Sequence, residues 1–145
     1  MAEAKIEKSL FLKAPRERVW EFLTDSACLG RWFHPSDRPL DTPGPYRLVK
    51  STEEPDACVC WGEVIEAEAP ARLVYTFTHK WLGEHVTRVE WTLSEVASGT
   101  LVKLVHDGFQ GAPVDVFEQL CGHDAGWDEH FVKLRVQVAE PAMAG

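Results

Sequence analysis

Three polar side chains are predicted to lie between a covered sheet face and the helix that covers it, where their chemistry would matter most. His79 and His106 alternate with large apolar residues in strand-like segments, and Asp124 lies close to an apolar helical stripe. A buried carboxylate needs a partner or a raised pKa. A His–Asp pair could therefore orient a bound molecule or act on it as acid and base. The alternatives are a satisfied polar pair, or an aspartate at a cavity mouth with its carboxylate in water.

Cys58 and Cys60 are the second candidate for chemistry, because two thiolates are common zinc ligands. Four histidines could complete such a site: His79, His85, His123 and His130. The Cys-x-Cys spacing matches no common zinc pattern, so we expect no metal and no cofactor. The two cysteines are adjacent on one face of a predicted strand, which is a poor position for a disulfide. Reduced thiols are therefore expected.

Sequence motifs for catalysis are missing. The chain has no nucleophile elbow, no second carboxylate motif and no glycine-rich phosphate loop. We therefore assign no catalytic residue and leave enzymatic activity open.

The composition predicts one domain and excludes some partners. A chain of 145 residues matches one ordinary domain, with an expected ordered core over about residues 5–139. The net charge of −8 and the lack of a concentrated Lys/Arg face exclude nucleic acid. The N-terminus has no signal-peptide core, and no run of about 18 apolar residues occurs. We expect a cytoplasmic protein that does not insert into membranes.

The first third of the chain predicts a strand followed by two short helices. The strand over residues 5–12 ends near Pro15, and proline is favoured in the first turn of a helix. Apolar residues then recur at helical spacing as far as Leu23. Asp25 has the type and position of an N-cap for the second helix. Four prolines between Pro35 and Pro45 predict a loop.

A long segment from Tyr46 alternates with period two, for about sixty residues. Short turn-like stretches at 68–71, 82–84 and 97–99 separate its strands. Short connections imply antiparallel neighbours. Charge on one strand face and aromatic residues on the other predict a sheet with one solvent-exposed side and one covered side.

The covering element is predicted to be a long C-terminal helix. After Pro113, apolar residues fall on one helical stripe: Val116, Phe117, Leu120, Trp127, Phe131, Leu134 and Val138. Gly122 and Gly126 are predicted to let this helix approach the strands closely. The predicted fold is α+β, with two short helices after the first strand and one long helix across an antiparallel sheet.

Many wide side chains between two curved layers favour a cavity, because rigid rings leave irregular gaps. The alternative is that these residues pack the core. Tryptophan and tyrosine also carry polar atoms that need partners. The predicted ligand-binding residues are Trp32, Phe33, Tyr75, Phe77, His79, Val89, Trp91, Leu104, His106, Phe117, Leu120, Asp124, Trp127 and Phe131.

The order and spacing of several short motifs resemble the START-like (SRPBCC) helix-grip superfamily, which shares the Bet v-like fold. Within it, the chain is most similar to homologues of the activator of the 90-kDa heat-shock chaperone's ATPase. The resemblance runs from Lys5 to Ala139. Its residues are Pro15, Val19-Trp20, Leu23-Thr24-Asp25, Leu29, Trp32, Gly62-Glu63-Val64, Pro70, Leu73-Val74-Tyr75-Thr76, Gly99-Thr100, His106, Gly108, Gly126-Trp127 and Leu134.

This resemblance implies a curved sheet that grips the C-terminal helix around a cavity for a small hydrophobic or amphipathic molecule. A carrier or sensor of such a ligand is the leading interpretation. A cofactor-free cyclase or dehydratase that uses His106 and Asp124 is the second. A chaperone-interaction module is the third. The eukaryotic co-chaperone has a further N-terminal domain for which this chain has no room, so we expect little chaperone activation.

Overall fold

The computed structural model describes residues 4–51, 53–82 and 85–139. Its six strands form one antiparallel sheet in the order β1-β6-β5-β4-β3-β2. The strands are β1 (Ile6–Leu12), β2 (Gly44–Ser51), β3 (Glu54–Glu68), β4 (Arg72–Phe77), β5 (Thr87–Val96) and β6 (Gly99–Asp107). The helices are α1 (Arg16–Thr24), α2 (Ser26–Trp32), the short 3₁₀ helix η1 (Lys80–Leu82) and α3 (Val116–Ala139).

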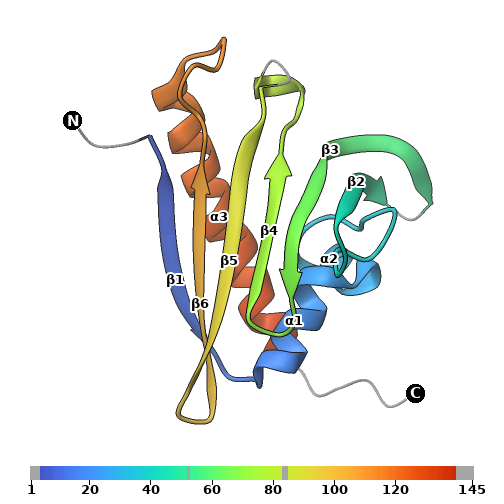
Figure 1. Ribbon diagram of the computed structural model, residues 1–145, viewed down its shortest axis with the longest axis vertical. Coiled ribbons are helices and arrows are strands. Elements are labelled where there is room, and N and C mark those ends of the chain that lie inside the picture. Colours follow the sequence, from blue (N-terminus) through green and yellow to red (C-terminus); the bar gives the residue numbers. More distant parts are fainter. Residues whose placement is uncertain (1–3, 52, 83–84, 140–145) are drawn as a thin grey trace.

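Figure 1 shows how the layers are arranged, with α3 running across one face of the sheet and α1 and α2 beside its C-terminal end. The predicted α+β helix-grip fold is confirmed. Among the described helices, none has a stretch long and apolar enough to cross a membrane.

The two short helices form where the sequence predicts them. Pro15 is the N-cap of α1. The carboxylate of Asp25 accepts a hydrogen bond from the Cys28 backbone N–H at 3.1 Å, which confirms Asp25 as the N-cap of α2. The Trp32 indole Nε1–H donates to the Phe22 carbonyl at 2.8 Å. This bond ties the end of α2 to α1 inside the core.

Arginines on these helices hold the C-terminal end of α3. Arg18 Nε donates to the Val138 carbonyl at 2.9 Å, and Arg31 Nε donates to the Gln137 side chain at 2.8 Å. A cation beside the last carbonyls of a helix is favourable, because these carbonyls carry partial negative charge. The position of α3 over the sheet is therefore fixed at this end.

The sheet largely follows the predicted alternation. The β3–β4 and β5–β6 connections lie at the predicted turns, between Glu68 and Arg72 and between Val96 and Gly99. The β4–β5 connection differs, because β4 ends at Phe77 and η1 follows. His79 therefore lies just beyond the strand on which it was predicted. Part of the predicted 82–84 turn lies outside the described residues.

Gly62 on β3 is at a point of very close approach between strands. A Cβ atom added there would lie 2.1 Å from the backbone oxygen of Thr76 on β4. The same oxygen accepts a hydrogen bond from the Tyr46 hydroxyl at 2.6 Å. Only glycine leaves room for this arrangement of three strands.

The stripe on α3 is shorter than predicted. Trp127, Phe131, Leu134 and Val138 are buried against the sheet, whereas Phe117 is 74% exposed. The prediction for Phe117 was wrong, because this residue lies about 80° around the helix from Trp127. Leu120 is half-buried against the core.

The predicted role of the two helix glycines was also wrong. Apart from the adjacent backbone of α3, a Cβ atom added at Gly122 or Gly126 would meet no atom of the described residues within 4 Å. These glycines therefore do not bring α3 into contact with the strands. They leave open space beside it.

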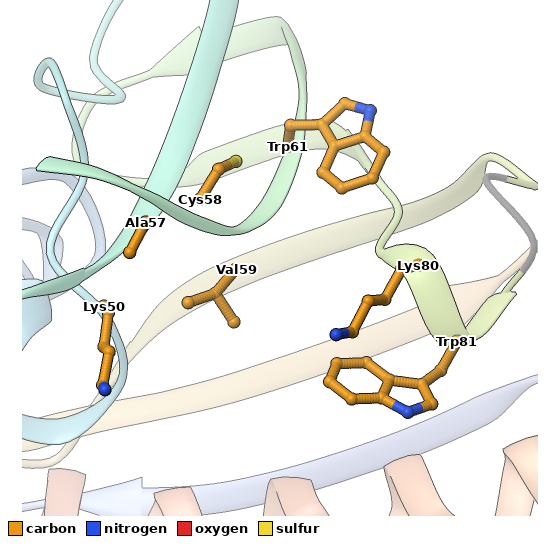
Figure 2. A pocket seen from close by; sticks show the side chains of 7 residues that line it. All are labelled: Lys50, Ala57, Cys58, Val59, Trp61, Lys80 and Trp81. Atoms are coloured by element: carbon orange, nitrogen blue, oxygen red, sulfur yellow. The ribbon is translucent and has the colours of Figure 1, made fainter.

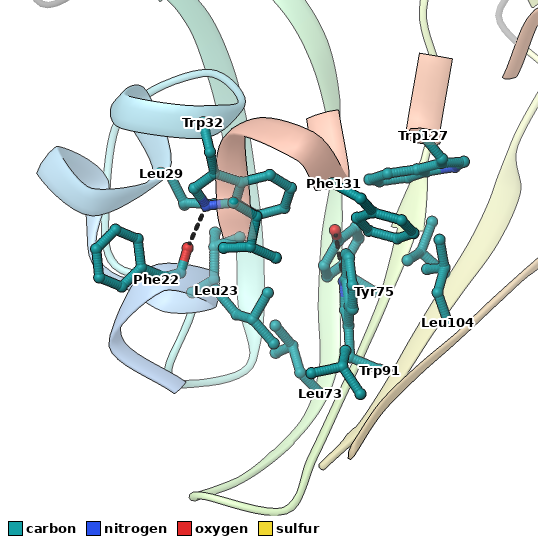
Figure 3. Packing of buried hydrophobic residues seen from close by; sticks show 14 of the residues in the cluster. Phe22, Leu23, Leu29, Trp32, Leu73, Tyr75, Trp91, Leu104, Trp127 and Phe131 are labelled. Carbon is teal, nitrogen blue, oxygen red and sulfur yellow. Dashed lines mark hydrogen bonds between the residues drawn. The ribbon is translucent and has the colours of Figure 1, made fainter. Parts of the chain in front are cut away.

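Trp91 lies at the centre of the aromatic core (Figure 3). Its Nε1–H donates to the Tyr75 hydroxyl at 3.0 Å, and its ring meets those of Trp32, Trp127 and Phe131 at centroid distances of 6.1, 5.5 and 6.0 Å. Eight of the predicted ligand-binding residues are packed in this buried core: Trp32, Tyr75, Phe77, Val89, Trp91, Leu104, Trp127 and Phe131. These rings pack closely against one another. The open space therefore lies beside them, next to Gly122 and Gly126 of α3.

Candidate functional site

A pocket of about 170 Å³ lies between α3, the end of α2 and the sheet. It is lined by Phe33, His34, Cys60, Phe77, His79, Gly122, His123, Gly126, Trp127 and His130. Gly122, Gly126 and His130 succeed one another at four-residue intervals, so they share one face of α3. The absent side chains at the two glycines leave the space that the pocket occupies.

Three aromatic rings form the apolar part of this pocket. Phe33 stacks on Trp127 at 5.3 Å between centroids and on Phe77 at 6.4 Å, with interplanar angles of 28° and 24°. His130 meets the Phe33 ring edge-on at 4.7 Å. Parallel rings of this kind suit a flat, apolar molecule.

His79 and His123 form the polar part of the pocket. Their Nε2 atoms are 2.9 Å apart, and His123 Nδ1 lies 2.7 Å from the Gln119 carbonyl. A carbonyl only accepts, so His123 Nδ1 carries the proton and its Nε2 accepts. His79 Nε2–H must then donate to His123, which leaves a lone pair on His79 Nδ1. That nitrogen is buried and has no hydrogen-bond partner in the part of the chain that the structure describes.

Burial keeps these imidazoles neutral. Desolvation, followed by the nearby His123, lowers the pKa of His79 to about 4. Desolvation likewise lowers the pKa of His34, His123 and His130. His130 Nδ1 lies 3.1 Å from the Trp32 carbonyl and so donates to it. At neutral pH the pocket therefore offers imidazole lone pairs rather than positive charge.

His106 is completely buried next to this pocket, but all of its polar atoms are already bonded. Trp127 Nε1–H donates to His106 Nδ1 at 3.1 Å, and His106 Nε2–H donates to Thr87 Oγ1 at 2.8 Å. The Thr87 hydroxyl in turn donates to the Phe77 carbonyl at 2.6 Å. Burial, followed by nearby His123 and His79, holds the pKa of His106 well below its ordinary value. This chain of bonds positions Trp127 as one wall of the pocket.

Asp124 does not face the pocket, so the predicted His106–Asp124 pair was wrong. The carboxylate is 57% exposed and lies 2.9 Å from Lys8 Nζ, which also contacts Asp128 at 2.8 Å. Asp124 comes directly after His123, and one residue rotates a helix by about 100°. That rotation carries Asp124 from the pocket to the side of α3 beside β1. The predicted acid–base pair of the enzyme hypothesis therefore has no carboxylate.

Replacing Asp124 with alanine should change little. Lys8 keeps Asp128, and an exposed ion pair contributes about 0–1 kcal/mol. We expect the free energy of unfolding to fall by less than about 1 kcal/mol, with no change in the His106 ring resonances in an NMR pH titration. A change in the His106 titration in this variant would instead show that Asp124 and His106 interact, as the sequence predicts.

The structure brings four of the predicted ligand-binding residues to the pocket: Phe33, Phe77, His79 and Trp127. Sequence analysis missed the contributions of His34, Cys60, Gly122, His123, Gly126 and His130. The four-residue spacing of Gly122, Gly126 and His130 was visible in the sequence. Within residues 4–51, 53–82 and 85–139, no three potential ligand side chains are grouped to hold a metal ion.

Known structures share this fold. CalU16 from Micromonospora echinospora is 24% identical, with a TM-score of 0.75 over 93% of this chain and 76% of that one. MLL2253 from Mesorhizobium loti is 21% identical, with a TM-score of 0.76 over 92% of this chain and 95% of that one. BH1534 from Bacillus halodurans is 25% identical, with a TM-score of 0.72 over 94% and 96% of the two chains. These similarities establish the fold.

Sequence comparison gives the family. No curated protein matches the chain significantly. The family described as "Activator of Hsp90 ATPase homolog 1-like protein" matches residues 13–139, which include both short helices, most of the sheet and all of α3. The chain therefore belongs to the family of Activator of Hsp90 ATPase homolog 1-like proteins.

Proposed function

We propose that this protein binds a small, mostly apolar molecule with a hydrogen-bond donor in the pocket between α3 and the sheet. One observation carries the proposal: the buried Nδ1 of His79, which has no hydrogen-bond partner among the described residues, lies on a residue that lines the same pocket as Phe33, Phe77 and Trp127. An unpaired buried acceptor costs free energy, which a donor on the ligand would recover. An aromatic ring that carries a hydroxyl or an amine supplies both the apolar surface and the hydrogen-bond donor.

The size of the pocket supports a ligand with one ring. A dry cavity of about 150 Å³ accepts a molecule the size of benzene, and this pocket has about 170 Å³. Drug-sized ligands occupy larger pockets, of about 300 Å³ or more. A simple phenol matches the volume, the stacked rings and the lone pair on His79.

Acid–base chemistry on the bound molecule is a second candidate function, supported by the His79–His123 hydrogen bond. A neutral imidazole can accept a proton from a substrate, and a second imidazole behind it can share the resulting charge. The cyclase or dehydratase alternative would then use His79 and His123 in place of His106 and Asp124. The third alternative, a chaperone partner, would contact an outer surface, and the geometry of this pocket does not support it.

Filling the pocket from the helix should prevent binding. In the Gly126→Leu variant the new side chain begins in open space, so α3 need not move. Replacing a helical glycine should also stabilise the helix, by about 0.5–1 kcal/mol. We expect affinity for 4-methylphenol, measured by isothermal titration calorimetry, to fall at least about tenfold, since the ligand loses its apolar contacts.

The matched control is Ala125→Leu, which places the same side chain at the adjacent, exposed position. It should bind 4-methylphenol like the parent. Equal affinity in the parent and Gly126→Leu would refute the proposed site, as would equal losses in both variants.

A further inference from the structure

A second pocket lies across β3 from the histidine-lined one. It has a volume of about 290 Å³ and is lined by Lys50, Ala57, Cys58, Val59, Trp61, Lys80 and Trp81 (Figure 2). Cys60 lines the first pocket, whereas its neighbours Val59 and Trp61 line this one. Successive side chains of a strand point to opposite faces, so Val59 and Trp61 project from the face of β3 opposite to Cys60, although Cys58 also borders the second pocket. They share no lining residue.

Trp81 on η1 is one of the exposed aromatic side chains of the protein. It is 62% exposed, and with Val59 and Trp61 it forms the apolar part of the lining. Trp81 belongs to η1, and its ring meets the His79 ring at 5.9 Å. This ring contact helps to fix the orientation of the Trp81 side chain.

Backbone hydrogen bonds hold the two tryptophan-bearing segments together. Trp61 N donates to the Thr78 carbonyl at 3.1 Å, and Thr78 N donates to the Trp61 carbonyl at 3.0 Å. This pairing fixes β3 next to the segment that leads into η1. Figure 2 shows Trp61 and Trp81 on opposite sides of the Lys80 side chain, facing the same hollow.

Two lysines line this hollow, Lys50 and Lys80, although the chain carries a net charge of −8. Lys80 Nζ lies 4.5 Å from the centroid of the Trp81 ring. Lys50 contributes a second ammonium group, which is 3.7 Å from the exposed Glu54 carboxylate. None of the described residues that line the pocket is acidic. Since Lys50 is paired with Glu54, Lys80 is the ammonium group that favours an anion here.

We propose that this second pocket binds a small aromatic carboxylate. The ring of the ligand packs against Trp61 and Trp81, and its carboxylate pairs with Lys80. Aromatic faces supply affinity for a flat ring, and the ammonium supplies a charge-assisted hydrogen bond. The volume of about 290 Å³ admits a larger molecule than the histidine-lined pocket does.

The test uses 2-naphthoate and its neutral analogue 2-naphthamide, followed through the six tryptophan indole N–H signals in ¹H–¹⁵N NMR spectra. We expect 2-naphthoate to shift the signals of Trp61 and Trp81. Those of Trp32 and Trp91, whose N–H groups donate inside the core, should stay unchanged. Weaker binding of 2-naphthamide is expected, by about fivefold, because it lacks the charge.

Two variants separate the ring contact from the charge. Lys80→Gln should weaken 2-naphthoate binding by about fivefold and leave 2-naphthamide unchanged, whereas Trp81→Ala should weaken both. Lys103→Gln, an exposed lysine on β6, is the matched control and should bind like the parent.

Gly126→Leu should also leave 2-naphthoate binding unchanged, which separates this proposal from that for the histidine-lined pocket. The proposal would be overturned if the Trp61 and Trp81 signals did not move, if the two ligands bound equally, or if Lys80→Gln and Lys103→Gln had the same effect.

Discussion

Acidification below pH 6.5 should destabilise the protein through His106 alone, with a slope that approaches about 1.4 kcal/mol per pH unit. His106 is buried and neutral, and its pKa in the folded state is well below the ordinary value. In the unfolded chain the same imidazole titrates near pH 6.5. Below that pH the unfolded state binds more protons, so stability falls by about 1.4 kcal/mol per pH unit for each such histidine. The loss continues until the pH reaches the folded-state pKa.

The four histidines of the pocket act in the same direction, because burial lowers each of their pKa values. For His79 the loss runs from about pH 6.5 down to its folded-state pKa of about 4. Urea unfolding at several pH values measures the total slope of the unfolding free energy against pH.

The His106→Gln variant lacks one titrating group. The slope of its unfolding free energy against pH should therefore be smaller by the contribution of about one proton. Gln110→Ala, at an exposed side chain that does not titrate, serves as the control and should keep the parent slope. If the His106 variant fails to fold, an NMR titration of the parent replaces it. A His106 ring that becomes protonated near pH 6.5 in the folded protein would contradict the prediction.

Gly62→Ala should lower the free energy of unfolding by about 3 kcal/mol, at the upper end for overpacking. The new Cβ would lie 2.1 Å from the Thr76 backbone oxygen, and backbone cannot rotate away as a side chain can. Relief requires β3 and β4 to separate, which also strains the hydrogen bond from the Tyr46 hydroxyl.

The control variant for this prediction should change the free energy of unfolding in the opposite direction. Gly122→Ala adds a Cβ that meets no described atom within 4 Å beyond the adjacent backbone of α3, and replacing a glycine inside α3 should stabilise the protein by about 0.5–1 kcal/mol. Urea unfolding of both variants checks the pair. Parent-like stability of Gly62→Ala would mean that the two strands are further apart than the structure places them.

The order of elements could be predicted because local patterns carry it. The alternation along β4 to β6, the N-cap at Asp25 and the turn before Gly99 each depend on neighbours within a few residues. The alternation of inward-facing and outward-facing side chains along β6 also predicted correctly that His106 is buried. Each of these features needs only the period of the element and the residues at its ends.

The site could be predicted only in part, because it depends on how α3 is rotated over the sheet. A rotation of about 100° per residue separates His123 in the pocket from Asp124 beside Lys8. The sequence does not specify that angle, so Phe117 and Asp124 were placed on the wrong side. The hydrogen bond between His79 and His123 joins residues 44 positions apart. Only the folded chain shows that Trp127 and Thr87, rather than Asp124, bond His106.

The central claim is that a ligand hydrogen-bond donor meets the lone pair of His79 in the histidine-lined pocket. The direct measurement is the His79 Nδ1 resonance in ¹⁵N NMR spectra during titration with 4-methylphenol and with 1,4-dimethylbenzene, which has a methyl group in place of the hydroxyl. We predict that 4-methylphenol moves this resonance towards that of a hydrogen-bonded nitrogen and binds about tenfold more tightly than 1,4-dimethylbenzene. Equal affinities with an unchanged His79 Nδ1 resonance would contradict the claim.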